Sequence, residues 1–208
     1  MDRAEQSPPR GPPVTEPEVA GADSILRRSQ IRYVVVGGQA VAREAATATH
    51  DVDVLVATAD FDRTVLRLQQ DPELTFDWKD GKLARFRIRS LGGVPLDVLN
   101  AVLFSGPRSG EEFFDYLLHE ASTEVDGIAY ATPEMVWYTR LLTKRWKAYA
   151  EKIVTNVIDG LGSHRLRGVE EIARRFGQDV TIKTRLAYVR NELSRPEVRS
   201  LLEGDQRR

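Results

Sequence analysis

The sequence predicts an α+β protein, in which a small mixed β-sheet is flanked by helices and followed by a C-terminal helical region. Two Val-rich runs, residues 32–36 and 51–56, are typical of buried strands and enclose an Ala-rich helical stretch. A second pair of strands is predicted at residues 82–90 and 94–99, on either side of a Gly-Gly turn. From Thr132-Pro133-Glu134, a strong helix start, the remaining chain reads as helices.

The chain divides into three parts by composition. Residues 1–20 are rich in Pro, Glu and Gly and poor in apolar side chains, so we expect a disordered tail. Residues 21–131 form the predicted core, and residues 132–208 form the helical region. The 208 residues carry a formal net charge of −1 and include no cysteine, which excludes disulfides and thiolate metal sites. Without a signal peptide or an apolar run of about 20 residues, we expect a cytoplasmic protein with no membrane partner.

The remaining elements follow from apolar spacing and turn residues. In the core, helices are predicted at residues 22–30, 39–48, 61–70 and 110–121, and a short strand at 127–130. In the helical region, a helix over 133–161 is expected to break near 144–148, and further helices cover 169–176, 182–193 and 196–202. Strands therefore fill the first half of the chain and helices the second.

Three carboxylates and a glycine pair form the candidate site. Gly37-Gly38 follows the first strand, twelve residues separate this pair from Asp51, and Asp53 lies two positions further along. Carboxylates two residues apart on a strand point to one face, so Asp51 and Asp53 can share a cation. Asp97 stands in an apolar strand, where a carboxylate is costly to bury unless it is paired or metal-bound. We expect Asp51, Asp53 and Asp97 to bind divalent metal and to carry the catalysis.

These groups suit phosphoryl chemistry. Glycines at a strand-to-helix turn let a phosphate approach backbone N–H groups, so we assign Gly37 and Gly38 to nucleotide binding. Paired metal ions roughly 4 Å apart hold attacking and leaving oxygens in line, and Asp97 could help to deprotonate the attacking hydroxyl. The sequence has neither the Gly-x-Gly-x-x-Gly spacing of a Rossmann fold nor the Gly-Lys-Ser/Thr of a P-loop. Taken singly, the two motifs are also compatible with a plain turn and a solvated strand end.

The combined motif resembles that of the DNA polymerase β-like nucleotidyltransferase superfamily: an apolar strand, Gly-Gly, a spacer, Asp-x-Asp and a later strand Asp. Two segments are most similar to the small bacterial AbiEii/MenT-type nucleotidyltransferases, many of which are toxins of toxin–antitoxin pairs. These segments are Val36-Gly37-Gly38-Gln39-Ala40 and Thr49-His50-Asp51-Val52-Asp53. The similarity covers roughly residues 32–161.

The resemblance implies the nucleotidyltransferase fold and an NTP-dependent enzyme. Such an enzyme moves a nucleoside monophosphate to a hydroxyl of an RNA (tRNA-like) or of a protein. The resemblance implies Mg²⁺ as the cofactor, with two ions and with Mn²⁺ as an alternative, bound by the three aspartates. A cognate antitoxin protein would be a further partner.

The resemblance also implies nucleotide-binding roles for three basic residues of the helical region. Arg140 falls where a lysine of the superfamily contacts the triphosphate. Arg145 matches a further arginine, and Lys152 stands at the start of a later element that resembles the Lys-Asp-x-x-Asp of these relatives.

Three positions depart from the pattern of these relatives. Thr47 stands where an arginine is common, and Ile153 and Asn156 stand where acids are usual. They leave the aspartates intact but keep an alternative open. In that alternative the chain is a non-catalytic nucleotide- or RNA-binding module, or a protein-interaction module, that retains the fold.

Two further groups of side chains could contact a polyanion. Arg85, Arg87 and Arg89 would share one strand face and could follow an acceptor backbone. Trp146 and Tyr149 lie among basic residues of one helix and could stack a base. A charged, solvated surface explains the three arginines equally well, and it is the more common explanation for the basic helix face.

Overall fold

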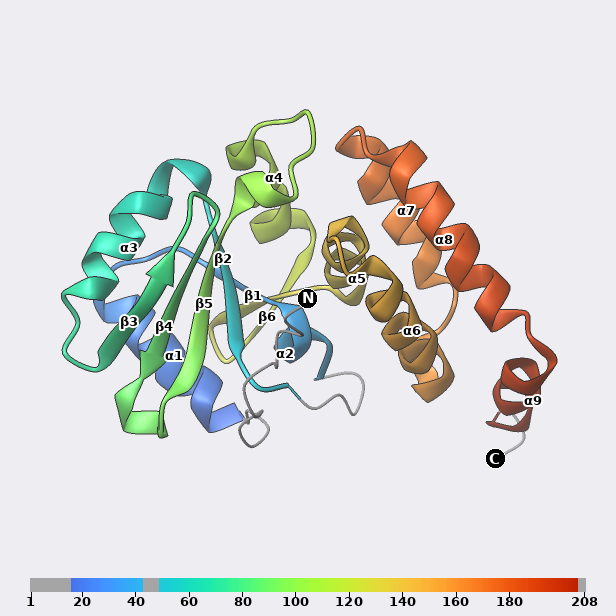
Figure 1. The fold of residues 1–208 in the computed structure, drawn as a ribbon, viewed down its shortest axis with the longest axis horizontal. Helices are drawn as coiled ribbons and strands as arrows, with labels where there is room; N and C mark the ends of the chain where they lie inside the picture. Colours follow the sequence, from blue (N-terminus) through green and yellow to red (C-terminus); the bar gives the residue numbers. More distant parts are fainter. Residues whose placement is uncertain (1–15, 43–48, 206–208) are drawn as a thin grey trace, which may run out of the picture.

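The computed structural model describes residues 16–42 and 49–205 and contains one seven-stranded sheet with the strand order β3-β4-β5-β2-β1-β7-β6 (Figure 1). Its strands are both parallel and antiparallel, and helices flank it, which confirms the predicted α+β class. The strands are β1 Val34–Val36, β2 Val52–Val56, β3 Leu74–Lys79, β4 Leu83–Ile88, β5 Val94–Asn100, β6 Ser122–Val125 and β7 Ile128–Ala131.

The central strand β2 sets the geometry of the candidate site. It pairs antiparallel with β1 and parallel with β5, so that Asp53 lies opposite both Val36 and Asp97. Directly paired residues of neighbouring strands place their side chains on the same face of the sheet. The residue after Val36 is Gly37, where the helix α2 (Gly37–Ala42) begins. The register therefore gathers a turn and two carboxylates from three strands.

The two faces of β3, β4 and β5 differ in their cover. On one face Ala84, Phe86 and Ile88 of β4 are fully buried, and the helices α1 (Glu16–Arg28) and α3 (Phe61–Gln69) pack on that side of the sheet (Figure 1). Arg85 and Arg87 alternate with these residues and are partly or largely exposed. We call the second face, which carries Arg85 and Asp97, the open face.

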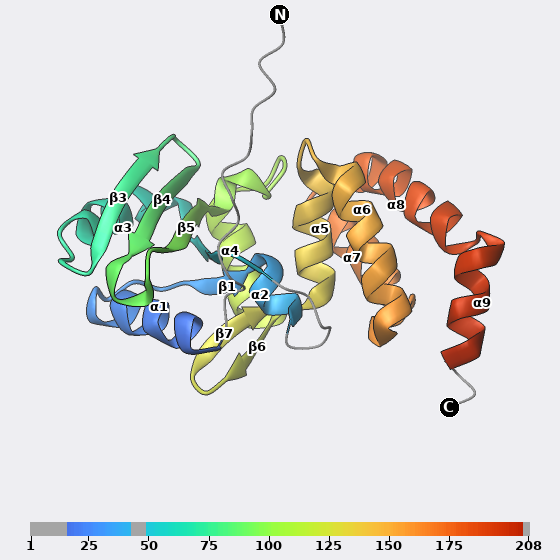
Figure 2. The same cartoon turned by 60° about the horizontal axis from the view of Figure 1, so that its bottom comes forward.

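The C-terminal helices lie together at the opposite end of the molecule from β3 (Figures 1 and 2). They are α5 Pro133–Leu142, α6 Trp146–Asn156, α7 Arg165–Arg175, α8 Asp179–Leu193 and α9 Pro196–Asp205. The predicted break near residues 144–148 is confirmed by the separation of α5 from α6, and a π-helical turn, Val157–Leu161, extends α6. No helix among residues 16–42 and 49–205 is long and apolar enough to cross a bilayer.

Several predicted boundaries need correction. Helix α1 begins at Glu16, so residues 16–20 are helical and were wrongly assigned to the tail; Val19 is buried, which offsets the cost of ordering them. Residues 1–15 and most of the predicted helix 39–48, including Thr47, lie outside the described residues. Helices α7 and α8 start three or four residues earlier than predicted. The remaining helix, α4 Gly110–Glu120, agrees closely with its prediction.

Two edge strands, β3 and β6, were not predicted. In β3 only Leu74 is buried, and in β6 no residue is fully buried, so neither has the apolar alternation that predicts a strand. Their backbones pair with β4 and β7, and this pairing rather than side-chain burial defines them.

An aromatic cluster joins the sheet domain to the helical region. The ring of Phe113 on α4 lies 4.9 Å from that of Phe176, at the end of α7, and 6.1 Å from that of Tyr138 on α5. The hydroxyl of Tyr138 donates a hydrogen bond to the carbonyl of Phe104 at 2.9 Å. All three rings are almost fully buried. The predicted division at residue 131 is therefore bridged by a shared core.

We predict that Phe176→Ala lowers the free energy of unfolding by about 3–5 kcal/mol, because it opens a cavity among rings from both regions. Urea unfolding followed by circular dichroism measures this change. Val180→Ala, at a helical side chain with 75% exposure, is the control and should change stability by less than about 0.5 kcal/mol. A loss of equal size in both variants would contradict the bridging role of the cluster.

Candidate functional site

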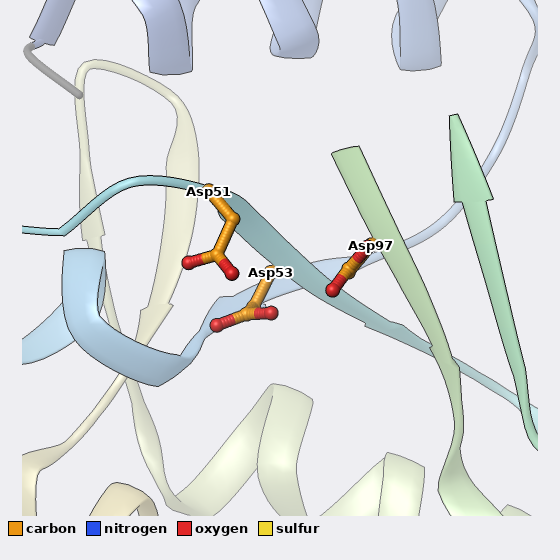
Figure 3. Close-up of side chains that lie close together, drawn as sticks. All are labelled: Asp51, Asp53 and Asp97. Atoms are coloured by element: carbon orange, nitrogen blue, oxygen red, sulfur yellow. The ribbon is translucent and has the colours of Figure 1, made fainter. Parts of the chain in front are cut away.

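Three carboxylates meet at the end of β2. One carboxylate oxygen from each of Asp51, Asp53 and Asp97 lies within 4.8 Å of the others (Figure 3). Asp51 directly precedes β2, Asp53 lies within it, and Asp97 comes from β5. Asp97 is 5% exposed, and its neighbours Leu96 and Val98 are fully buried on the other face. The structure therefore brings the three predicted aspartates together.

The glycine turn packs directly on this group. Gly37 has a φ of 68°, in the left-handed region that favours glycine, and a Cβ atom there would overlap the carboxylate of Asp53. A Cβ atom on Gly38 would lie 2.8 Å from the Cβ atom of Thr49. Both glycines are therefore required by the close approach of α2 to β2. Their predicted contact with a phosphate remains a prediction.

Thr49 and Gln39 support the turn, and sequence reasoning gave neither a role. The Thr49 hydroxyl donates to the carbonyl of Asp51 at 2.9 Å and accepts from Gln39 Nε2 at 3.4 Å. Both side chains are buried. The only sequence signal was their place beside Gly37-Gly38 and Asp51. These bonds fix the backbone from which the Asp51 carboxylate projects.

Arg85 on β4 binds Asp97 through both carboxylate oxygens. Its Nε donates to Oδ1 at 2.7 Å and its Nη2 to Oδ2 at 2.5 Å, a bidentate pair. The same Nη2 lies 3.9 Å from an oxygen of Asp51. Arg85 therefore lies in the candidate site, and its guanidinium is used to neutralise an aspartate of the site.

Arg140 approaches the carboxylates from the helical region. It lies in the last turn of α5, is 9% exposed, and its guanidinium carbon lies 5.5 Å from the centre of the Tyr149 ring. Burial lowers the pKa of Arg140, whereas Tyr149, Asp53 and Asp51 act in the opposite direction. Within the described part of the chain, its buried Nη1 atom has no hydrogen-bond partner. A charged donor without an acceptor in such a place suits an anionic ligand.

Burial and like charge act together on the carboxylates. Removal from water raises the pKa of Asp53 well above its ordinary value, and the charges of Asp51 and Asp97 raise it further. The pKa of Asp51 is raised first by burial and then by Asp97, while Arg85 and His50 oppose this shift. The two arginines only partly offset the cost of holding three acids here.

The donor set fits a hard divalent cation. Carboxylate oxygens are the ligands that Mg²⁺ and Mn²⁺ prefer in proteins, and three of them converge here. A bound cation would also relieve the repulsion that raises the pKa values of Asp51 and Asp53. Asp51, Asp53 and Asp97 are the residues that would hold it.

The other predicted nucleotide-binding residues lie on α6 or at its start. Arg145 is exposed at the N-cap, and the amino group of Lys152 lies 5.8 Å from the centre of the Tyr149 ring. The same ring lies under Arg140, so Tyr149 connects Lys152 to the edge of the site. The divergent residues Ile153 and Asn156 are buried. The nucleotide contacts of Arg145 and Lys152 remain predictions.

No family model and no curated protein matches this chain. Among solved structures, an antigenic nucleotidyltransferase-like protein from Paracoccidioides brasiliensis aligns over 92% of this chain and 94% of its own, with 18% identity and a TM-score of 0.48. The Megavirus polyadenylate synthase aligns over 70% of this chain and 33% of its own, with 15% identity and a TM-score of 0.42. ANT(2″)-Ia, in complex with adenylyl-2″-tobramycin, aligns over 86% and 98%, with 12% identity and a TM-score of 0.44. These values are too low to add an argument to the geometry of the three carboxylates.

We predict that Gly37→Ala destabilises the protein by about 1–3 kcal/mol, because an L-residue is strained at this φ and its Cβ atom displaces Asp53. It should also weaken Mn²⁺ binding, measured by calorimetric titration. Gly81→Ala is the matched control, because a Cβ atom there meets nothing within 4 Å. Equal behaviour of the two variants would contradict the close approach of the turn to Asp53.

We also predict a pH-dependent effect of divalent cations. Asp51 and Asp53 have pKa values above those of the unfolded chain, so the folded state binds more protons and the metal-free protein loses stability as pH rises above about 4. Mn²⁺ should therefore raise the Tm more at about pH 8 than at about pH 5, in thermal unfolding with and without EDTA.

The matched variants for this experiment are Asp53→Asn and Asp62→Asn. Asp53→Asn removes a ligand charge and should abolish the rise in Tm with Mn²⁺. Asp62 lies on α3 with an 80% exposed side chain, so Asp62→Asn should retain the rise. A rise that persists in Asp53→Asn would place the cation elsewhere.

Proposed function

We propose that this chain is a nucleotidyltransferase that moves a nucleoside monophosphate from an NTP to an acceptor hydroxyl. The observation that carries the proposal is the meeting of three aspartates beside a buried arginine whose Nη1 lacks a partner within the described residues. Anionic metal ligands and a cationic phosphate ligand, side by side, are what a metal-bound triphosphate requires. The proposed fold is accordingly the nucleotidyltransferase fold.

The donor nucleotide lies on the side of β1, α2 and α5 in this proposal. Arg140 donates to an oxygen of the triphosphate, which supplies the acceptor that its Nη1 atom lacks. The backbone of Gly37 packs directly against the carboxylate of Asp53, because glycine has no side chain there. This contact keeps Asp53 in place. Mg²⁺, when bound to Asp51, Asp53 and Asp97, neutralises charge on the phosphates.

The acceptor oxygen attacks the α-phosphorus, the new P–O bond forms, and the bond to pyrophosphate breaks. The proton of the acceptor hydroxyl passes to a carboxylate oxygen of Asp97, which lies on β5, the neighbour of β2 on the side of β4 and β3. Arg85 fixes the orientation of that carboxylate through two hydrogen bonds. Most of the rate enhancement comes from this positioning and from electrostatic stabilisation.

The finer points of the proposal follow from the resemblance in sequence. The acceptor hydroxyl belongs to an RNA, tRNA-like, or to a protein, and Mg²⁺ is the ion, with Mn²⁺ as an alternative. A role as the toxin of a toxin–antitoxin pair, with an antitoxin as partner, is part of the same proposal. The neighbouring reading frame tests that role most directly.

We predict that Asp53→Ala and Asp51→Ala each lower label transfer by about 100-fold or more, because each removes a metal ligand. Transfer is measured from α-labelled NTPs with Mg²⁺ onto total tRNA, onto the protein itself and onto a cell extract. Asp62→Ala is the control for an exposed acid and should retain transfer. If the wild-type protein transfers label from none of the four NTPs to any acceptor, the enzymatic proposal fails.

One observation favours a second candidate, a non-catalytic nucleotide- or RNA-binding module. Both oxygens of Asp97 are already bonded to Arg85, an arrangement that neutralises the carboxylate without a metal. Such a module would bind Mg-ATP equally well after Asp97→Asn and would show no turnover. Calorimetric titration of Mg-ATP into wild type, Asp53→Ala and Asp97→Asn separates the two candidates, since the enzyme should lose affinity in both variants.

A further inference from the structure

We propose that Trp78 on β3, on the same face of the sheet as Arg87, is a stacking platform for a base of the acceptor, a single-stranded nucleic acid. The inference rests on the proposed function and names the class of acceptor. Neither residue lies among those of the candidate metal site.

Trp78 belongs to the same row of paired residues as the aspartates. It pairs with Arg85, Arg85 pairs with Asp97, and Asp97 pairs with Asp53, across four neighbouring strands. Paired residues share one face of a sheet, so Trp78 lies on the open face. Two strand spacings separate it from Asp97, on the order of 10 Å. A terminal nucleotide can reach the carboxylates while a neighbouring base lies on Trp78.

A β-bulge places the side chain of Trp78 on the open face. The pairing shifts between Phe76 and Trp78, so that Phe76 faces Phe86 on the covered side, with ring centres 5.4 Å apart. Without the shift, residues two apart would point to one face. The next residue, Lys79, lies over Phe61 of α3 at 5.5 Å, again on the covered side. Trp78 is therefore turned towards the side of the carboxylates, the side on which Asp77 binds Arg87.

The open face is accessible around Trp78. Trp78 is 42% exposed, and the side chain of Arg87 is 48% exposed. The β3 and β4 strands lie at the end of the sheet farthest from α6, and no helix of the described residues covers this face of them (Figure 2). An exposed indole beside an arginine offers a surface on which a base can stack.

The position of the platform fits an in-line transfer. The donor side is formed by the turn at Gly37-Gly38 and by Arg140, on the β1 side of β2. The attacking and leaving oxygens lie on opposite sides of the phosphorus. The acceptor therefore approaches from the other side of β2, where β5, β4 and β3 follow in order.

Three arginines lie on the platform, and one of them is bonded to a neutral group. Arg85, Arg87 and Arg89 reach the open face, the last through a hydrogen bond from its Nε to Thr75 Oγ1 at 2.9 Å. The acids opposite them are Asp97 and Asp51 beside Arg85, and Asp77, which binds Arg87. This arrangement corrects the expected arginine ladder, because Arg89 lies in the 3-10 turn Arg89–Leu91 rather than in a strand. Arg89, whose hydrogen bond goes to a neutral hydroxyl, keeps its positive charge for a phosphate.

A partner protein strand added to β3 is the competing occupant of this edge. The bulge between Phe76 and Trp78, with Asp77 and Lys79 around it, disturbs the regular ladder that such an addition needs. Stacking requires only the exposed indole face, so the nucleic acid is favoured. Bases must be unpaired to stack in this way, which favours a single strand.

The test is binding of fluorescein-labelled single-stranded oligonucleotides to the full-length protein in EDTA, without NTP, by anisotropy. Trp78→Ala should weaken binding about 5- to 100-fold, and Trp78→Phe should restore most of it. Phe76→Ala, on the same strand but facing the covered side, should bind as the wild type does. Arg89→Gln, which removes a guanidinium bonded to a neutral hydroxyl rather than to a carboxylate, should lower the slope of log K against log salt by about 0.7, the value for one phosphate contact on a single strand.

Comparing the affinities of an RNA and a DNA oligonucleotide of equal sequence shows which nucleic acid is the acceptor, because a contact to the 2′-hydroxyl would favour the RNA. Equal oligonucleotide affinity of the wild type and Trp78→Ala would overturn the platform. The platform is also overturned if the wild-type enzyme binds no oligonucleotide and transfers label to a protein. Because binding is measured without NTP or metal, its result does not depend on catalysis. If the protein binds the oligonucleotide through Trp78 but transfers no label, only the enzymatic proposal is contradicted.

Discussion

Three carboxylates held within 4.8 Å of one another are the constraint on which this structure depends. The parallel pairing of β2 with β5 sets Asp53 opposite Asp97, and both strands are buried on their other face. The register of the two strands therefore keeps both carboxylates on one face at the centre of the sheet. The repulsion therefore has to be relieved by groups brought to the carboxylates, and the raised pKa values of Asp51 and Asp53 indicate that the protein alone does not relieve it fully.

Two arginines approach this group from opposite sides and differ in what they do. Arg85 donates two hydrogen bonds to Asp97, so its positive charge neutralises a carboxylate of the protein. Arg140 is more deeply buried and keeps an Nη1 atom without a partner among the described residues. A buried, unpaired donor lowers stability, and such a cost is expected where a ligand supplies the acceptor. This contrast is the reason for proposing that Arg140 binds the phosphates, whereas Arg85 orients Asp97.

Much of this site could be predicted from local sequence, and the remainder depends on register. Asp97 was identified because a lone carboxylate in an apolar strand needs a partner, and Gly37-Gly38 because a turn separates two buried strands. The Arg85–Asp97 pair could not be assigned, since it depends on how the hairpin between β4 and β5 aligns. Trp78 was missed for a related reason: β3 has no apolar period, and its bulge reverses the face that simple alternation would give.

The same register explains why the aspartates alone do not define the substrate. They lie at the middle of the sheet, between the proposed donor side, with α2 and α5, and the proposed acceptor side, with β4 and β3. The donor side is enclosed: Arg140 is buried and Gly37 leaves no space beside Asp53. The acceptor side is an exposed sheet surface, where Trp78 and Arg87 can change without loss of core packing. In the proposed enzyme, selectivity for the nucleotide would therefore be tied to the stability of the fold, whereas selectivity for the acceptor would depend on side chains that the fold does not require.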